Sequence, residues 1–189
     1  MVTAPAELGR ERAVRIASAV PDPELPFLTL ADLGVLRGIG YDPEAGEVTV
    51  ELTPTYLGCP AVAEMRAVLD ARLRAAGFPR VEVRTVLSPP WTPELISAEG
   101  RRKLAEHGIA PPVGSAESAA GGPVPLRLGP TRHRAAAEGA VDPVRCPRCG
   151  SAETVETSAF GAAPCRSLWR CESCLEPFEH IKSLPGGIS

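Results

Sequence analysis

The sequence predicts an α+β fold in which a small mixed sheet with helices is followed by a cysteine-rich module. Two segments, around residues 13–20 and 62–73, carry apolar residues at the spacing of one helix face. Short segments with strand-like patterns lie between and after them. Four of the six cysteines gather near the C-terminus as two pairs of Cys-x2-Cys form, which indicates the second module.

Residues 1–109 are expected to form the α+β domain. In its first helix Ala13, Ala17 and Val20 share one face, and Pro21 ends the helix because proline cannot continue it. The elements expected after this helix are strands at 35–40 and 47–52 with a turn at 42–46, a helix after Cys59 that Gly77 ends, a strand at 81–87, and a short helix from Ser97 to His107.

Residues 110–142 differ in composition and are expected to be a flexible linker. Ala, Pro, Gly and Ser make up 20 of these 33 positions. Such a segment cannot bury enough apolar surface to offset the entropy cost of ordering it. The cysteine-rich module is therefore expected to be separate, at residues 143–182, with strands at 153–158 and 167–170.

The two cysteine pairs predict a metal site. Cys146 and Cys149 form one pair, and Cys171 and Cys174 form the other. Each pair directs two sulfurs at one point, so two pairs complete a tetrahedron. A closed set of four thiolates indicates structural Zn²⁺ in a zinc ribbon, and iron in the same tetrahedron stays an alternative. Because the module has little apolar content, the metal is expected to be required for its folding.

A fifth cysteine, Cys59, stands where a predicted strand meets a predicted helix. Pro60 suits the first helical position, so Cys59 is expected to be the N-cap. The positive end of the helix dipole should lower the pKa of this thiol and favour the thiolate, which binds metals and attacks electrophiles. A buried cysteine without a chemical role is the alternative. For Cys165 a small buried side chain is favoured over a role in metal transfer.

Two carboxylates and two hydroxyls are candidates for a polar pocket with Cys59. Asp22 and Glu24 lie in a segment that two prolines make rigid, so both carboxylates are presented from a fixed loop. Thr53 and Thr55 precede Cys59 in the connection from strand to helix. The alternative for Asp22 and Glu24 is an ordinary turn followed by an extended segment.

These motifs resemble the iron–sulfur assembly domain of the SufT and eukaryotic cytosolic Fe–S targeting family. The resemblance covers about residues 10–90 and implies an α+β domain that delivers Fe–S clusters to target enzymes. It makes Cys59 the key thiol and places Asp22 and Glu24 in an acidic loop. The motifs that carry it are Asp22-Pro23-Glu24-Leu25-Pro26, Asp32-Leu33-Gly34-Val35, Leu52-Thr53-Pro54-Thr55 and Gly58-Cys59-Pro60.

Further motifs follow the first domain and recur in the ribbon. They are Pro89-Pro90-Trp91-Thr92-Pro93-Glu94, Gly100-Arg101-Arg102-Lys103-Leu104 and Gly108-Ile109-Ala110-Pro111-Pro112, then Phe160-Gly161, Cys165, Leu168-Trp169-Arg170-Cys171 and Glu176-Pro177-Phe178. Together they resemble the family of D subunits of the phenylacetyl-CoA epoxygenase system. This resemblance implies a non-catalytic maturation factor for Fe–S or other metal centres of that oxygenase, in aerobic phenylacetate degradation. Its implied partners are the oxygenase and reductase components and the Fe–S assembly machinery, with a transient Fe–S cluster at Cys59.

Two other functions stay open. The chain is alternatively a structural or docking subunit of the oxygenase, or, ranked lower, a thiol redox enzyme that uses Cys59. The sequence has no Glu-x-x-His pair for a di-iron site and no Gly-x-Gly-x-x-Gly motif for a nucleotide cofactor, so it is not expected to be the oxygenase or the reductase itself.

Composition argues against several classes of partner and location. The net charge is −3, and the segment after residue 142 contains five basic and five acidic residues. No nucleic-acid partner is therefore expected. No apolar run is long enough to span a bilayer, and residues 1–12 lack the apolar core of a secretory signal. A cytoplasmic protein without a membrane partner is therefore expected, and a homodimer is compatible with the sequence.

Overall fold

The computed structural model describes residues 5–112 and 143–182, and most of the expected linker lies outside these ranges. The first unit contains a three-stranded mixed sheet. β1 (Leu36–Asp42) is antiparallel to β2 (Glu47–Leu52), and β2 is parallel to β3 (Arg80–Thr85). The expected α+β class is thereby confirmed, and the bounds of β2 agree with the predicted strand.

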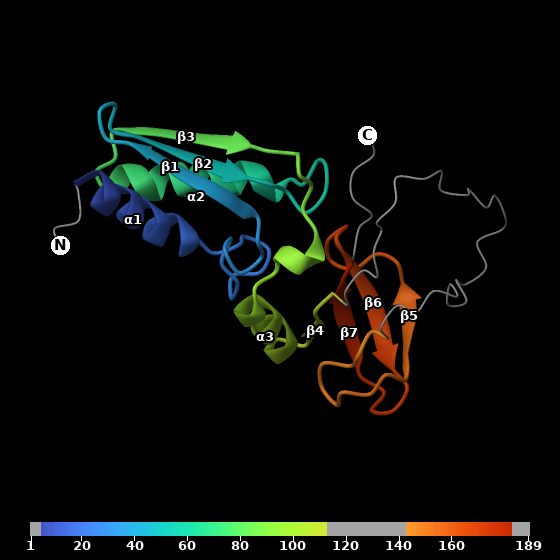
Figure 1. Cartoon of the computed structure of the whole chain (residues 1–189). Coiled ribbons are helices and arrows are strands. Elements are labelled where there is room, and N and C mark those ends of the chain that lie inside the picture. The colour runs from blue at the N-terminus through green and yellow to red at the C-terminus, as the bar shows by residue number, and fades with distance from the viewer. Residues whose placement is uncertain (1–4, 113–142, 183–189) are drawn as a thin grey trace.

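Two helices pack against one face of this sheet, as Figure 1 shows. α1 (Pro5–Ser18) contacts β1, and α2 (Ala61–Ala75) contacts β3 and α1. The apolar faces predicted from helical spacing are the buried ones: Ala13 and Ala17 of α1 and Leu69 of α2 are fully buried.

The predicted turn and caps are present. In the turn between β1 and β2 the carboxylate of Asp42 accepts two backbone N–H bonds, at 2.9 and 3.1 Å. Ser97 caps α3 (Ala98–Glu106) by accepting the N–H of Gly100 at 2.9 Å. Gly108 follows α3 with a φ of 74°, a conformation that favours glycine.

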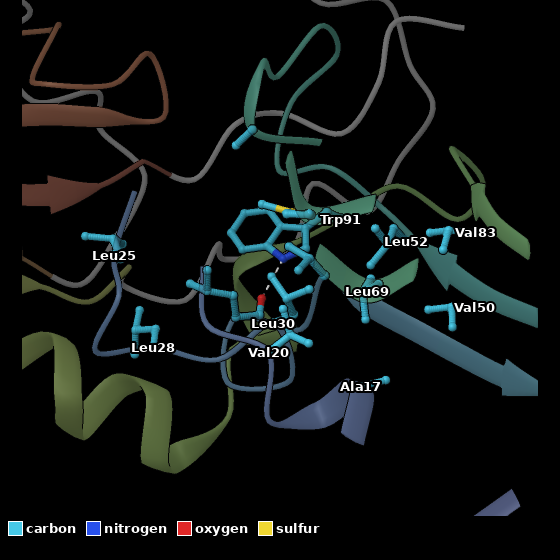
Figure 2. Close-up of a cluster of buried hydrophobic side chains, with 14 of the residues drawn as sticks. Ala17, Val20, Leu25, Leu28, Leu30, Val50, Leu52, Leu69, Val83 and Trp91 are labelled. Carbon is cyan, nitrogen blue, oxygen red and sulfur yellow. Dashed lines mark hydrogen bonds between the residues drawn. The ribbon is translucent and has the colours of Figure 1, made fainter. Parts of the chain in front are cut away.

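The segment after β3 completes the core of the first unit. Trp91 is buried there, and its indole N–H donates to the carbonyl oxygen of Leu33 at 2.8 Å. Figure 2 shows this bond as the dashed line from the nitrogen of Trp91. A short 3-10 helix, η1 (Pro93–Leu95), leads from Trp91 towards α3. Lys103 of α3 bonds the carboxylate of Asp32 at 2.8 Å, so this segment is attached by polar contacts as well as by packing.

The second unit is a four-stranded sheet in the order β4-β7-β6-β5. Its strands are β4 (Ile109–Ala110), β5 (Thr154–Ser158), β6 (Arg166–Cys171) and β7 (Pro177–Ile181). β5, β6 and β7 are antiparallel neighbours, as in a ribbon, whereas β4 pairs with β7 in parallel. The sequence predicted β5 and β6 but missed β4 and β7.

The short strand β4 joins the two units. Ile109 packs in the core of the first unit, and its neighbour Ala110 packs in the core of the second. Ile181, at the end of β7, also lies in the first core. The domain boundary expected between residues 109 and 110 passes through β4, and separate folding of the two parts stays a prediction. Within the described residues no helix has the length and apolar content to cross a membrane.

Candidate metal and thiol sites

The four ribbon cysteines converge on one point. Their sulfur atoms all lie within 4.8 Å of one another, although the residues come from opposite ends of the ribbon sequence. The sulfur of Cys146 is 3.7 Å from that of Cys174, and the sulfur of Cys149 is 3.5 Å from that of Cys171. The two predicted pairs thus contribute to a single cluster.

Local backbone geometry prepares this cluster for a metal ion. Gly150 has a φ of 75°, and its N–H donates to the carbonyl of Cys146 at 2.9 Å, which closes the first turn. In the second turn the N–H of Cys174 donates to the sulfur of Cys171 at 3.5 Å. This bond is the largest cause that lowers the pKa of Cys171 to about 7, whereas the pKa of Cys149 is raised to about 12 despite a backbone bond from Ser151, because other thiols lie close to it. One thiolate therefore forms readily, and the others lose their protons to the incoming metal.

The sulfur positions fit a tetrahedral metal. Metal–sulfur bonds of about 2.3 Å at tetrahedral angles give sulfur–sulfur edges of about 3.8 Å. The pairs at 3.5 and 3.7 Å are close to this length, so an ion fits with little movement of the side chains. Four thiolates leave no position for a substrate, and such a set holds the module together.

Cys59 lies in the connection from β2 to α2, directly before the first residue with helical angles. α2 is assigned from Ala61, but Pro60 already has φ −66° and ψ −26°, as the first helical residue does. The Cys59 sulfur accepts the N–H of Ala61, two residues further on, which is the bond of an N-cap side chain. These features agree with the predicted N-cap role of Cys59.

The pKa of Cys59 is raised, which contradicts the predicted lowering. Burial of the thiol is the largest cause, and the charges of Glu24 and Asp22 add to it. The bonds from the Ala61 N–H and from the Tyr56 hydroxyl lower the pKa, but they do not outweigh these effects. The helix end was visible in the sequence, whereas the burial and the carboxylates depend on the fold.

The acidic loop is where the sequence placed it. Asp22 is 4% exposed, and its Oδ1 accepts the N–H groups of Glu24 and Leu25 at 2.9 and 2.8 Å. Burial nevertheless raises the pKa of Asp22. Glu24 is exposed, and its charge raises the pKa of the Cys59 thiol. Asp22, Glu24 and Cys59 thus form one acidic thiol site.

Thr53 and Thr55 contribute less to the pocket around Cys59 than the sequence predicted. Among the described residues no hydrogen bond joins Thr53 or Thr55 to Cys59. Thr53 is buried just after the end of β2, and its hydroxyl has no hydrogen-bond partner within the described structure. Tyr56, which the sequence analysis did not single out, donates its hydroxyl to the Cys59 sulfur. Burial and this bond raise the pKa of Tyr56 to about 12.

The ribbon brings two further groups to this site. Cys165 precedes β6, and the charges of Glu24 and Cys59 act on its half-buried thiol. Arg166 is 8% exposed, and its charge acts on Asp22. Sequence reasoning missed both partners, because more than one hundred positions separate them from the residues that they approach.

The fold and the two cysteine sites define a class of protein, an iron–sulfur cluster assembly domain followed by a zinc ribbon. The family model described as iron-sulfur cluster assembly protein matches residues 11–87. The family model described as PaaD zinc beta ribbon domain matches residues 130–182. The two matches together account for both units, including the four ribbon cysteines and the acidic thiol site.

Comparison with known proteins then gives the family. The chain is 36% identical over 169 residues to an Escherichia coli (strain K12) protein named as the D subunit of 1,2-phenylacetyl-CoA epoxidase, covering 89% of this chain and 90% of that protein. It belongs to the family of these D subunits, PaaD. It is also 35% identical over 81 residues to the Fe-S protein maturation auxiliary factor SufT of Staphylococcus aureus (strain USA300), covering 41% of this chain and 88% of that protein.

Two solved structures are similar to about half of the chain. A DUF59 domain of unknown function from Bacillus anthracis is 27% identical, with a TM-score of 0.45, and the match covers 52% of this chain and 93% of that one. A conserved hypothetical protein from Thermotoga maritima is 31% identical, with a TM-score of 0.42, and the match covers 50% of this chain and 92% of that one.

Proposed function

We propose that this protein is a non-catalytic maturation factor for Fe–S or other metal centres of the phenylacetyl-CoA epoxygenase system. The observation that carries the proposal is the half-buried thiol of Cys59, which lies beside Asp22 and Glu24 within an iron–sulfur assembly domain. A relative named as an epoxidase subunit and one named as a maturation factor support the two halves of the proposal.

The electrostatics of Cys59 suit a carrier that must release its cargo. Burial and nearby carboxylates raise the pKa of this thiol, so it is largely protonated at neutral pH. An incoming metal ion or cluster displaces that proton, and the proton competes for the sulfur again when the cargo leaves. Binding is therefore weaker than at a preformed thiolate, which favours transfer over storage.

The ribbon in this proposal binds structural Zn²⁺ and docks the client enzyme. Its closed set of four thiolates leaves no coordination position for transfer chemistry. Its basic and acidic residues balance, which favours a protein partner over a nucleic acid. The proposed clients are the oxygenase and reductase components, and the proposed donor is the Fe–S assembly machinery.

A structural or docking subunit of the oxygenase is the second candidate. The observation that favours it is the exposure of large apolar side chains on the ribbon, where Phe160 is 72% and Leu175 is 67% exposed. A thiol redox enzyme is less well supported. The raised pKa of Cys59 leaves little of the thiolate that attacks electrophiles at neutral pH.

The test compares the iron content of the client enzymes. Oxygenase and reductase are produced with the wild-type protein, with Cys59→Ala, or with Glu44→Gln, which changes an exposed turn residue at the opposite end of β2 from the thiol. We expect under-metallated client with Cys59→Ala and normal iron with the other two. Full iron occupancy in both clients, together with co-purification of the protein at fixed stoichiometry, would instead establish the structural subunit.

A further inference from the structure

Cys165 belongs to the ribbon but lies at its contact with the first unit. Its backbone carbonyl accepts the N–H of Lys182 at 2.9 Å, which ties it to the end of β7. The neighbouring Ile181 is buried in the core of the first unit. Figure 1 shows this end of the ribbon turned towards the connection from β2 to α2, which carries Cys59.

Several charges meet at this contact. Burial of the Cys165 thiol raises its pKa, and negative charges on Glu24 and on Cys59 raise it further. The same three groups act on the hydroxyl of Tyr56. Cys59 packs against the same apolar core that contains Ile181, and Cys165 is bonded to Lys182, the neighbour of Ile181. Packing and electrostatics therefore both place Cys59 and Cys165 at this contact.

The ribbon side of the contact is held by a buried ion pair. Arg166, next to Cys165 in sequence, bonds Glu179 at 2.6 Å, and both side chains are largely covered. The charge of Arg166 also acts on the buried carboxyl of Asp22 in the first unit. These polar contacts fix the position of Arg166. Because Cys165 is its neighbour in sequence, the packing of the two units also fixes where the Cys165 thiol lies.

We propose that Cys165 is the second thiolate of a metal-cargo site whose first thiolate is Cys59, with Glu24 supplying a carboxylate oxygen. The inference rests on the proposed function and specifies its cargo as a thiophilic divalent transition-metal ion, such as Fe²⁺. Two thiolates and one carboxylate carry like charges, and a divalent cation offsets their repulsion. Binding releases the two thiol protons and changes no oxidation state.

The proposed cargo site differs from the ribbon site in having three ligands in place of four and in being less compact without an ion. Among residues 5–112 and 143–182, the ribbon cysteines are the set whose ligand atoms lie within 4.8 Å of one another, and Cys59, Cys165 and Glu24 do not belong to it. An ion must therefore draw these three side chains together. A set of three ligands exchanges its ion more readily than a closed set of four, which separates a cargo site from a structural site in one chain.

The test is an anoxic titration of Fe²⁺ into the full-length protein with its ribbon loaded with zinc, followed by native mass spectrometry. We expect the wild type to bind a further Fe²⁺ beyond the ribbon metal. Cys59→Ala and Cys165→Ala should each weaken this binding by at least the roughly 10–100-fold that loss of an outer-shell partner costs. Glu24→Gln should weaken it as well, whereas Glu44→Gln, in an exposed turn, should bind like the wild type.

Retention of the ribbon zinc and an unchanged circular dichroism spectrum show that a variant is folded. If Cys165→Ala does not fold, Cys165→Ser is used in its place. A trivalent arsenical on the wild type, which forms two As–S bonds with loss of water, should link the Cys59 and Cys165 peptides. Unchanged iron binding in the Cys165 variants, or no second ion in the wild type, overturns the inference. The proposed function is tested separately, by the iron content of the client enzymes.

Discussion

At the scale of single residues, burial outweighs hydrogen bonding at the acidic thiol site. Asp22 accepts two backbone N–H bonds, which stabilise a carboxylate, yet its pKa is raised because the side chain is withdrawn from water. Cys59 accepts bonds from Ala61 and Tyr56 and shows the same net direction. Both groups therefore favour their protonated forms more than they would in an unfolded chain.

The first prediction concerns Asp22→Asn and pH. A carboxyl whose pKa is raised on folding contributes stability at a pH below its unfolded value, near 3.9, and loses that contribution as the pH rises through the folded value. The amide of the variant does not titrate, so Asp22→Asn should gain stability relative to the wild type as the pH rises from about 3.9 through the raised pKa of the folded state. Urea unfolding at several pH values measures the difference.

A matched control for this experiment lies in the first hairpin. Asp42 makes the same pair of bonds to backbone N–H groups but is exposed. Asp42→Asn therefore reports the effect of the amide on these bonds without the burial. The free energy of unfolding of Asp22→Asn relative to the wild type should rise with pH. If it stays constant or falls, burial does not raise the pKa of the Asp22 carboxyl.

The second prediction concerns the reactivity of Cys59. Removing the charge of Glu24 by Glu24→Gln should lower the pKa of the thiol and speed its alkylation at about pH 7.5. Tyr56→Phe removes a bond that favours the thiolate, so alkylation should slow. Peptide mass spectrometry of the zinc-loaded protein after timed iodoacetamide treatment gives the rates. Equal rates in both variants would contradict the electrostatic account.

The residues of the candidate site could be proposed from the sequence, but its electrostatics could not. Local motifs singled out Asp22, Glu24 and Cys59, and the family resemblance favoured a functional role for them, which stays a prediction. The sign of the pKa shift and the approach of Cys165 arise from tertiary packing, for which the sequence carries no local signal. Tyr56, three positions before Cys59, was within reach of sequence reasoning and was overlooked.

At the scale of elements, the pairing of β4 with β7 attaches the ribbon to the first unit. β4 has two residues, Ile109 and Ala110, and they pair with Glu179 and His180 of β7. Such a strand is too short to show periodicity, and its partner lies far away in the sequence. Helices and hairpin strands were predicted because their patterns and turns are local, whereas this pairing is not.

The third prediction tests the attachment through Ile181. This side chain is 4% exposed and packs in the first core, so Ile181→Ala should destabilise the docked arrangement by about 2–5 kcal/mol. Val155→Ala, at a 43% exposed position of β5, should change stability by less than about 0.5 kcal/mol. Urea unfolding of zinc-loaded protein measures both, and equal effects would show that Ile181 does not anchor the ribbon.

At the scale of the whole molecule, two units with different sources of stability share one strand. The first unit has an extended apolar core that includes Trp91 and the buried side chains of β2. The second has a small buried cluster that contains Cys146 and Cys171. The ribbon is therefore expected to depend on its metal, whereas the first unit is not.

The fourth prediction concerns metal removal. A chelator, or the substitutions Cys149→Ser and Cys174→Ser, should release the ribbon metal and make residues 143–182 sensitive to protease. The first unit should stay folded but with a lower Tm, because it loses the packing of Ile181. Each loss of about 1 kcal/mol corresponds to a shift of about 4–8 °C for a domain of this size. Melting of both units in a single transition would show that they form one cooperative domain.

The pairing of β4 with β7 also means that the ribbon is linked to the first unit twice. One link is the covalent chain through residues 113–142, and the other is the non-covalent contact through β4 and Ile181. Cleavage of the first link lowers the effective concentration of the partners but leaves the second link in place. The molecule is therefore suited to fragment complementation: two polypeptides divided within residues 113–142 should reassemble in the presence of zinc, and their co-elution should be lost with Ile181→Ala.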